Sequence, residues 1–85
     1  MIDIKTYARK LGIPVSAIYS KSRKTEVVTA RQVYWRLMLN NGFSYSEIGR
    51  FFNKNHATII HGISKINDFI SVNDSYLKRY LDAIE

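Results

Sequence analysis

The chain has 85 residues, of which 46% are hydrophobic and 13% aromatic, and its formal net charge is +6. This length allows one domain, and the composition excludes a disordered or collagen-like chain. The absence of cysteine excludes a disulfide framework and thiolate zinc sites. No signal peptide precedes the first helical pattern, and no run of about 18 apolar residues is present to span a bilayer. We therefore expect a single cytoplasmic domain.

The positive charge is concentrated in the longer N-terminal part of the chain. Residues 1–66 carry eleven Lys and Arg against three Asp and Glu, whereas residues 67–85 carry two against four. A polyanion such as DNA is the simplest partner for a surface with this positive charge. A protein that binds DNA in this way would be associated with the nucleoid. A membrane is a poorer partner, because no segment combines a basic face with a broad hydrophobic one.

The chain begins with a pattern for two short helices and a loop. Asp3 is a suitable N-cap for a helix over residues 3–11, which Gly12 ends. Pro14 is tolerated in the first turn of a second helix. Residues 20–26 contain no apolar side chain and predict an exposed, basic loop.

A longer helix is predicted from Val27 to Asn40, because its apolar residues recur with a period near 3.6. Arg31, Gln32 and Arg36 fall outside the apolar stripe, and Arg31 is expected on an exposed face. Asn40, Asn41 and Gly42 end this helix.

Residues 44–61 then predict two helices joined by a tight polar turn, the outline of a helix-turn-helix. Ser44 or Ser46 starts the first of these helices, with Glu47 in a capping arrangement. Gly49 costs about 1 kcal/mol relative to alanine within a helix, which indicates a close helix approach. The residues expected to face inward are Ile48, Phe51 and Phe52.

The second of these helices is capped by Asn55 and runs to Ile70. Its inner stripe comprises Ile59, Ile60, Ile63, Ile66, Phe69 and Ile70. A last helix, capped near Asn73 and covering about 73–84, has no DNA-binding face and is expected to be structural. Without repeats or linkers, residues 1–85 are predicted to form one compact all-α domain of five to six helices.

Four segments resemble, in order and spacing, the C-terminal DNA-binding domain of the bacterial replication initiator DnaA. They are residues 20–24, 27–32, 46–49 and 56–61, and the resemblance extends over about 4–68. It implies a Trp-repressor-like helical fold. It also implies that the helix-turn-helix enters the major groove of a short DNA box while the loop reaches the adjacent minor groove.

The resemblance assigns the loop arginine, Arg23, to the minor groove. A narrow A·T-rich minor groove concentrates negative potential and attracts guanidinium groups. Lys21 and Lys24 flank Arg23 and are suited to neutralising phosphates. Arg31 and Gln32 match a pair that contacts the DNA backbone in the family, although an ordinary surface role for Arg31 is nearly as compatible with the sequence.

At the start of the fourth helix, Tyr45 and Ser46 are candidates for a phosphate contact, because helix N-terminal amides and the dipole favour anions. A simple capping role is the alternative, and the two are compatible.

The base-reading candidates lie in the first turn of the fifth helix: Asn55, His56, Ala57 and Thr58. Further along, Lys65 resembles a backbone-contacting lysine. His61 is a candidate phosphate contact or a half-buried packing residue. His56 and His61 do not form a metal site, because they lie about 140° apart on the helix and have no Cys or nearby carboxylate partner.

Two departures from the family pattern concern base recognition. The turn over residues 53–55 is one residue shorter than usual, and Asn55 occupies the position of an aspartate. A carboxylate suits cytosine N4, whereas an asparagine suits adenine N6 and N7. Ala57 replaces a threonine and keeps only a methyl-sized contact. The preferred DNA site is therefore expected to differ from the usual box.

The sequence carries no GxxxxGK[ST] loop for an ATPase and no cofactor motif, and its scattered carboxylates form no catalytic constellation. We expect a binding protein and not an enzyme, and favour a stand-alone binder over an excised domain. Sequence-specific binding of double-stranded DNA, in replication-origin or transcription regulation, is the first hypothesis. The alternative is an interaction module that binds a replication protein through an aromatic surface around Tyr34, Trp35 and Phe43. The oligomeric state stays open.

Overall fold

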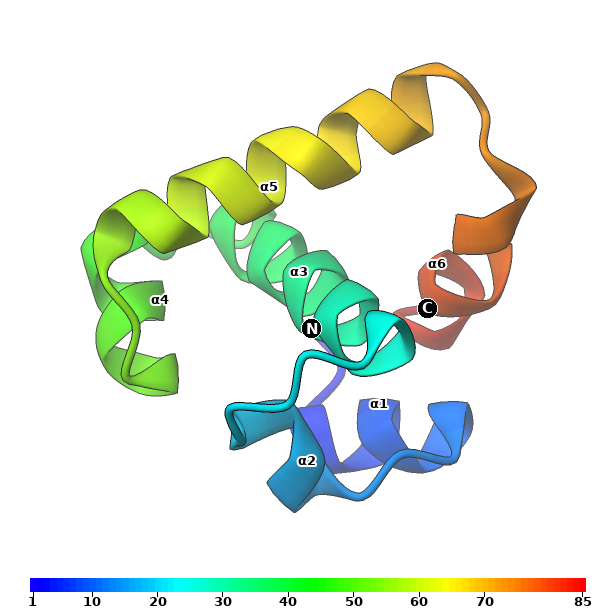
Figure 1. The fold of residues 1–85 in the computed structure, drawn as a ribbon, viewed down its shortest axis with the longest axis horizontal. Helices are drawn as coiled ribbons and strands as arrows, with labels where there is room; N and C mark the ends of the chain where they lie inside the picture. The colour runs from blue at the N-terminus through cyan, green and yellow to red at the C-terminus, as the bar shows by residue number, and fades with distance from the viewer.

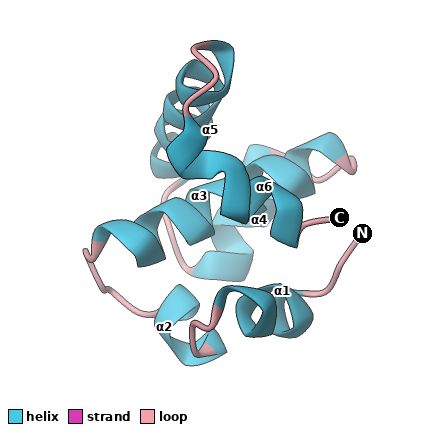
Figure 2. Cartoon of the chain, turned by 90° about the vertical axis from the view of Figure 1, so that its right-hand side faces the viewer, coloured by secondary structure: helices cyan, strands magenta, loops and turns pink.

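Helices form every regular element of the structure, a computed structural model that describes all of residues 1–85. In chain order they are α1 (Ile4–Leu11), α2 (Val15–Tyr19), α3 (Thr25–Asn40), α4 (Tyr45–Phe52), α5 (His56–Ser71), the 3₁₀-helix η1 (Ser75–Leu77) and α6 (Lys78–Ala83) (Figure 1). Short loops join them, as Figure 2 shows. The prediction of an all-α chain of five to six helices is confirmed. No helix has the length and apolar character needed to cross a bilayer.

The helix ends follow the capping residues of the sequence. Asp3 accepts a hydrogen bond from the Thr6 amide at 3.0 Å, and Gly12 ends α1 in the left-handed region with φ of 70°. At α4 the cap is Ser44 and not Ser46. The Ser44 hydroxyl accepts from the Glu47 amide at 3.1 Å, and the Glu47 carboxylate accepts from the Ser44 amide at 2.9 Å.

One predicted boundary is wrong, and another is placed one residue further along the chain. Helix α3 begins at Thr25, two residues before the expected Val27, because the Lys24 carbonyl already accepts from the amides of residues 27 and 28. The basic loop is therefore residues 20–24. The cap expected near Asn73 is the next residue, Asp74. Its carboxylate accepts from the Tyr76 amide at 2.9 Å and starts η1, which leads directly into α6.

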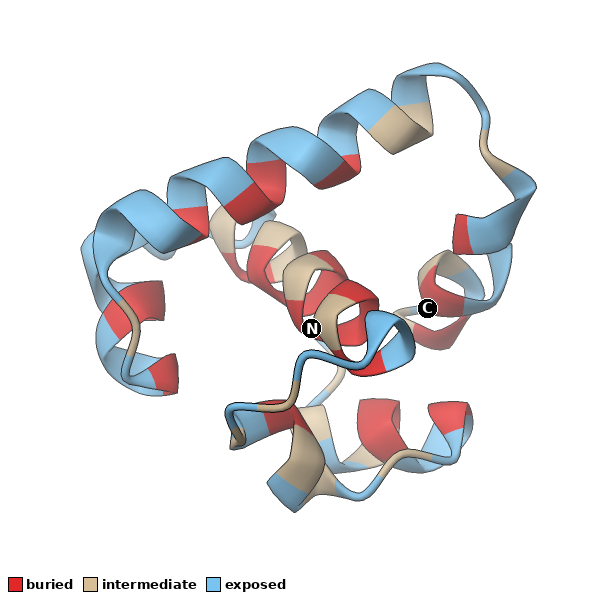
Figure 3. Ribbon diagram, in the orientation of Figure 1, coloured by how far each residue is buried: buried red, intermediate tan, exposed pale blue.

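Helix α3 lies at the centre and contacts α2, α4, α5 and α6. One cluster of 17 buried residues forms the core, with Tyr7, Ile18, Ile48 and Ile59 among its fully buried members. The buried positions line the faces of α3, α4 and α5 that meet, whereas the outer face of α5 is exposed along its length (Figure 3). Helix α6 completes the core through Tyr80 and its neighbours, which agrees with the structural role expected for it.

Two residues expected to face inward do not. Phe51 is 56% exposed and Ile60 is 38% exposed. Helix α4 packs along Ile48 and Phe52, which lie one turn apart, and Phe51 stands about 100° around the helix from Phe52. Helices α4 and α5 each bury a stripe that is narrower than their set of apolar residues. The helical period of the apolar residues alone therefore overestimates the number of core residues.

Two glycines lie where another part of the chain comes very close to a helix. A Cβ atom at Gly49 would lie 2.6 Å from the Lys54 carbonyl oxygen, so the close neighbour is the backbone of the turn after α4, whereas the sequence predicted a close approach of another helix. A Cβ atom at Gly62 would lie 2.6 Å from Cζ3 of Trp35. The second contact sets the crossing of α5 over α3 and was not predicted.

Candidate nucleic-acid interface

The turn between α4 and α5 places the start of α5 at the protein surface. Asn53 ends α4 with φ of 54°, and the Lys54 amide donates to the Gly49 carbonyl at 2.7 Å. The Asn55 Oδ1 atom then accepts from the Ala57 amide at 2.7 Å and caps α5. As a result, Asn55 and the next three residues are exposed: His56, Ala57 and Thr58.

Further exposed polar residues continue along the outer side of α5. Thr58, His61 and Lys65 follow one another at spacings of three and four residues, which places them on one side of the helix. Ile59 and Ile63 are buried on the opposite side. The packing alternative for His61 is not realised, because its side chain is exposed.

Beside this turn lies a hollow of about 390 Å³ with no hydrophobic residue in its lining. Ser46 contributes to it from α4, and its hydroxyl is free because Ser44 provides the cap. Arg50 and Lys54 add two cations that the sequence did not single out. Their positions in the sequence, on either side of the predicted turn, could have identified them as candidates. Tyr45, the first residue of α4, is also exposed.

The basic loop presents Lys21, Arg23 and Lys24 to solvent. None of them forms an ion pair, since the single salt bridge of the structure joins Lys78 to Asp82. The cationic groups of the loop are therefore available to an anionic ligand.

Arg31 lies beneath this loop, and the expectation that it occupies an exposed face is wrong. Its side chain is only 5% exposed. Its Nε donates to the Ile18 carbonyl and its Nη2 to the Ser20 carbonyl, both at 2.8 Å, and Nη1 donates to the Ser22 carbonyl at 3.4 Å. Burial lowers the pKa of the guanidinium, which nevertheless stays charged at neutral pH. Arg31 thus ties α2 and the basic loop to α3.

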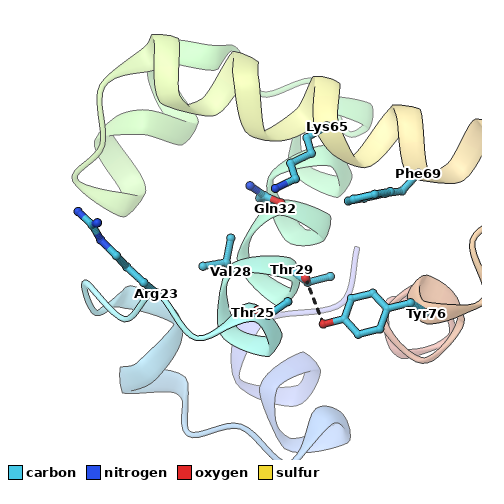
Figure 4. A pocket seen from close by; sticks show the side chains of 8 residues that line it. All are labelled: Arg23, Thr25, Val28, Thr29, Gln32, Lys65, Phe69 and Tyr76. Atoms are coloured by element: carbon cyan, nitrogen blue, oxygen red, sulfur yellow. Dashed lines mark hydrogen bonds between the residues drawn. The ribbon is translucent and has the colours of Figure 1, made fainter.

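A groove runs between the N-terminal half of α3 and the middle of α5, and it joins the basic loop to η1 (Figure 4). Its volume is about 490 Å³. Arg23 lines one end, Lys65 reaches down from α5 toward the half-buried Gln32, and Tyr76 points toward Thr29 at the other end. No carboxylate lines this α3–α5 groove.

The aromatic surface expected around Tyr34, Trp35 and Phe43 is not present. Tyr34 and Trp35 are both buried. The Tyr34 hydroxyl donates to the Ile2 carbonyl at 2.8 Å, and the Trp35 ring packs against Phe52 and Gly62. Only Phe43 is exposed.

The fold and the interface define a DNA-binding helix-turn-helix domain, in which α4 and α5 form the motif and cations flank its exposed tip. Residues 4–66 match the family described as "Bacterial dnaA protein helix-turn-helix". The chain belongs to this family.

Among curated relatives, the chain is similar to the chromosomal replication initiator protein DnaA of several bacteria. It is 40% identical to that of Bacteroides thetaiotaomicron over 75 residues, which cover 86% of this chain and 16% of the relative. It is 39% identical to that of Bacteroides fragilis over 84 residues, which cover 96% of this chain and 17% of the relative. The chain thus spans about a sixth of the length of the relatives it matches. Helices η1 and α6 lie beyond the residues that match the family.

Proposed function

We propose that this domain binds a specific sequence of double-stranded DNA, with α5 in the major groove and Arg23 in the adjacent minor groove. The observation that carries the proposal is the α3–α5 groove, which brings Arg23 of the basic loop and Lys65 of α5 to one carboxylate-free surface. The two elements that would enter neighbouring DNA grooves therefore lie on either side of one path that suits a phosphate backbone.

Base recognition is assigned to the first turn of α5. Thr58 offers a hydroxyl and a methyl group, and His56 offers ring nitrogens. Ala57 leaves room for a close approach. Since Oδ1 of Asn55 is engaged in the cap, its outward group is the Nδ2 donor. A lone donor suits the acceptors of guanine or thymine in the major groove better than the paired groups of adenine.

Phosphate contacts are assigned to residues that surround these reading positions. They neutralise charge or donate hydrogen bonds without carrying sequence information. They comprise Lys21, Lys24, Gln32, Tyr45, Ser46, His61 and Lys65. Arg31 supports the basic loop and is not assigned a phosphate.

The relatives are named as chromosomal replication initiators. By extension, we place the role of this chain at replication-origin or regulatory DNA, on the bacterial nucleoid.

A randomised duplex library tests the proposal. The protein is expected to enrich one short sequence, and recovery of no common sequence would refute specific binding. Arg23→Ala should then relax an A·T preference on one flank, whereas Thr58→Ala should change the preference within the core. Arg9→Ala removes the same charge from an exposed arginine outside the groove and should leave the enriched sequence unchanged. Loss of the same preference in both Arg23→Ala and Thr58→Ala would contradict their separate roles.

A further inference from the structure

The η1 end of the α3–α5 groove contains a tyrosine hydroxyl that is only weakly engaged. Tyr76 is 45% exposed, and its hydroxyl lies 3.5 Å from Thr29 Oγ1 and 3.3 Å from the Tyr80 hydroxyl. Hydroxyl hydrogen bonds are usually about 2.7–2.8 Å long. Both contacts are therefore weak, and Tyr76 is able to donate to a stronger acceptor.

The position of this hydroxyl is fixed by the chain around it. The Asp74 cap starts η1 and holds the backbone of Tyr76, whose ring packs on Tyr80 with centroids 5.6 Å apart. Thr29 is nearly buried on α3, directly opposite. The Thr29 hydroxyl is placed to donate to Tyr76 while Tyr76 donates outward.

The cation of this groove is Lys65, which reaches from α5 toward Gln32 in the middle of the groove (Figure 4). Lys65 has no carboxylate partner, and its Nζ lies 6.0 Å from the centroid of the Phe69 ring, a residue that also lines the groove. An ammonium group and an exposed tyrosine hydroxyl, in one groove that no carboxylate lines, suit the oxygens of a phosphodiester strand that passes both.

The proposed docking supplies such an oxygen. A sugar-phosphate strand separates the major groove from the minor groove of a duplex. With α5 in one and Arg23 in the other, that strand has to cross the surface between them, along Val28 and Gln32 in the α3–α5 groove. Followed away from Arg23, the same path ends at Tyr76 (Figure 4).

We infer that the Tyr76 hydroxyl binds a backbone phosphate of this strand, with Lys65 supplying positive charge further along the same groove. The contact extends the DNA footprint beyond residues 4–66, the segment that matches the helix-turn-helix family, to Tyr76. The inference rests on the proposed function and adds a DNA contact to a C-terminal segment for which only a structural role was expected.

Tyr76→Phe removes the hydroxyl and keeps the ring. The variant should bind the selected duplex about tenfold more weakly, the usual effect of losing a hydrogen bond to a charged group, and should lose affinity equally for a scrambled duplex. Ethylation interference should identify one phosphate whose modification weakens the wild type but not Tyr76→Phe. Tyr19→Phe is the matched control. Tyr19 is 40% exposed, lies outside the groove and makes no side-chain hydrogen bond. The Tyr19→Phe variant should therefore bind the selected duplex as tightly as the wild type.

Thermal unfolding of both variants separates a binding effect from a folding effect. Unchanged affinity of Tyr76→Phe for a duplex that the wild type binds specifically would overturn the inference and leave the proposed function intact. Failure of the wild type to bind any duplex specifically would overturn both. If Tyr76→Phe binds more weakly but ethylation of the same phosphates still weakens its binding, the contact would also be refuted.

Discussion

At the scale of single residues, Arg31 shows how a buried cation supports a surface made for an anion. No carboxylate pairs with it. Instead, backbone carbonyls of α2 and the basic loop accept the hydrogen bonds of its planar guanidinium group. This arrangement neutralises none of the loop's positive charge. It also fixes the backbone on either side of Lys21, so that Arg23 is presented from an anchored segment.

Arg31→Met should destabilise the domain by about 2 to 3 kcal/mol, because it leaves buried carbonyl groups unpaired. Arg31→Lys should rescue little of this loss, since an ammonium group cannot reproduce the fork. Urea unfolding followed by the fluorescence of Trp35 measures both effects. Arg36→Met makes the same change on the same helix at a residue that bonds only Asn67, and should cost less.

The same variants distinguish support of the loop from a direct DNA contact. If Arg31 bound a phosphate, Arg31→Met would keep the stability of the wild type, and its slope of log affinity against log salt would be shallower by about 0.9. That outcome would contradict the structural role.

Asn55 offers a substitution that separates recognition from folding. Asn55→Asp keeps an equally good N-cap, so the free energy of unfolding should change by less than about 0.5 kcal/mol. The outward group changes from a donor to an acceptor. The preferred base at one position should therefore shift toward cytosine or adenine, which present amino donors. Library selection with the variant checks this, and an unchanged preference would show that Asn55 does not face a base.

At the scale of helices, the crossing of α5 over α3 sets where the reading residues lie. Trp35 and Gln32 of α3 meet the backbone of α5 at Gly62, with 3.2 Å between Gln32 Cγ and the Cβ position. Any side chain at this point pushes α5 away from α3, and with it the Lys65 wall of the groove. Stability and DNA affinity are coupled here.

Gly62→Ala should destabilise the domain by about 1 to 3 kcal/mol, the usual range for overpacking a core, although alanine favours the helix by about 1 kcal/mol. Ser64→Ala on the exposed side of α5 gains propensity without a clash and should be neutral or slightly stabilising. Denaturant unfolding of the two variants is the measurement. Equal stability of Gly62→Ala and the wild type would mean that the two helices are not tightly packed.

The helices were predictable from sequence because their signals are local. Asp3, Ser44 and Asn55 are caps whose partners lie two or three residues away. The burial of Arg31 was not predictable, because its partners lie on α2 and the basic loop, up to 14 residues away. The contacts of Gly62 and Tyr76 were not predictable for the same reason, because their partners lie on α3 and only the tertiary structure brings them together.

At the scale of the whole molecule, α6 joins the C-terminal end of the chain to α1. Arg79 donates to the Leu11 carbonyl and Lys10 to the Glu85 carbonyl, both at 3.0 Å. Tyr80 is buried between these elements and the core. Helices α1 and α6, which carry no proposed base-reading residue, are therefore joined to each other and form the frame of the domain that supports α3, α4 and α5.

Buried tyrosines make this frame sensitive to alkaline pH. Burial, reinforced by the Tyr76 hydroxyl, raises the pKa of Tyr80 from 10.0 to about 12, and burial also raises the pKa of Tyr7. In the unfolded chain these groups ionise near pH 10, whereas in the folded protein they stay neutral. The contribution of these two tyrosines to stability should therefore be fully present below about pH 10 and be lost as the pH rises toward 12.

Urea midpoints at about pH 8 and about pH 11 test this expectation. Tyr80→Phe should show a smaller decline between them than the wild type. An identical decline would assign the effect to other groups.

The affinity of the protein for its selected duplex, compared with its affinity for a scrambled duplex of the same composition, tests sequence-specific DNA binding. Fluorescence anisotropy at two salt concentrations gives both ratios. Specific binding predicts a preference of at least about 10³-fold that persists at both salt concentrations, while both affinities fall with salt because phosphates are neutralised. Equal affinities for the two duplexes would contradict sequence-specific recognition by the first turn of α5.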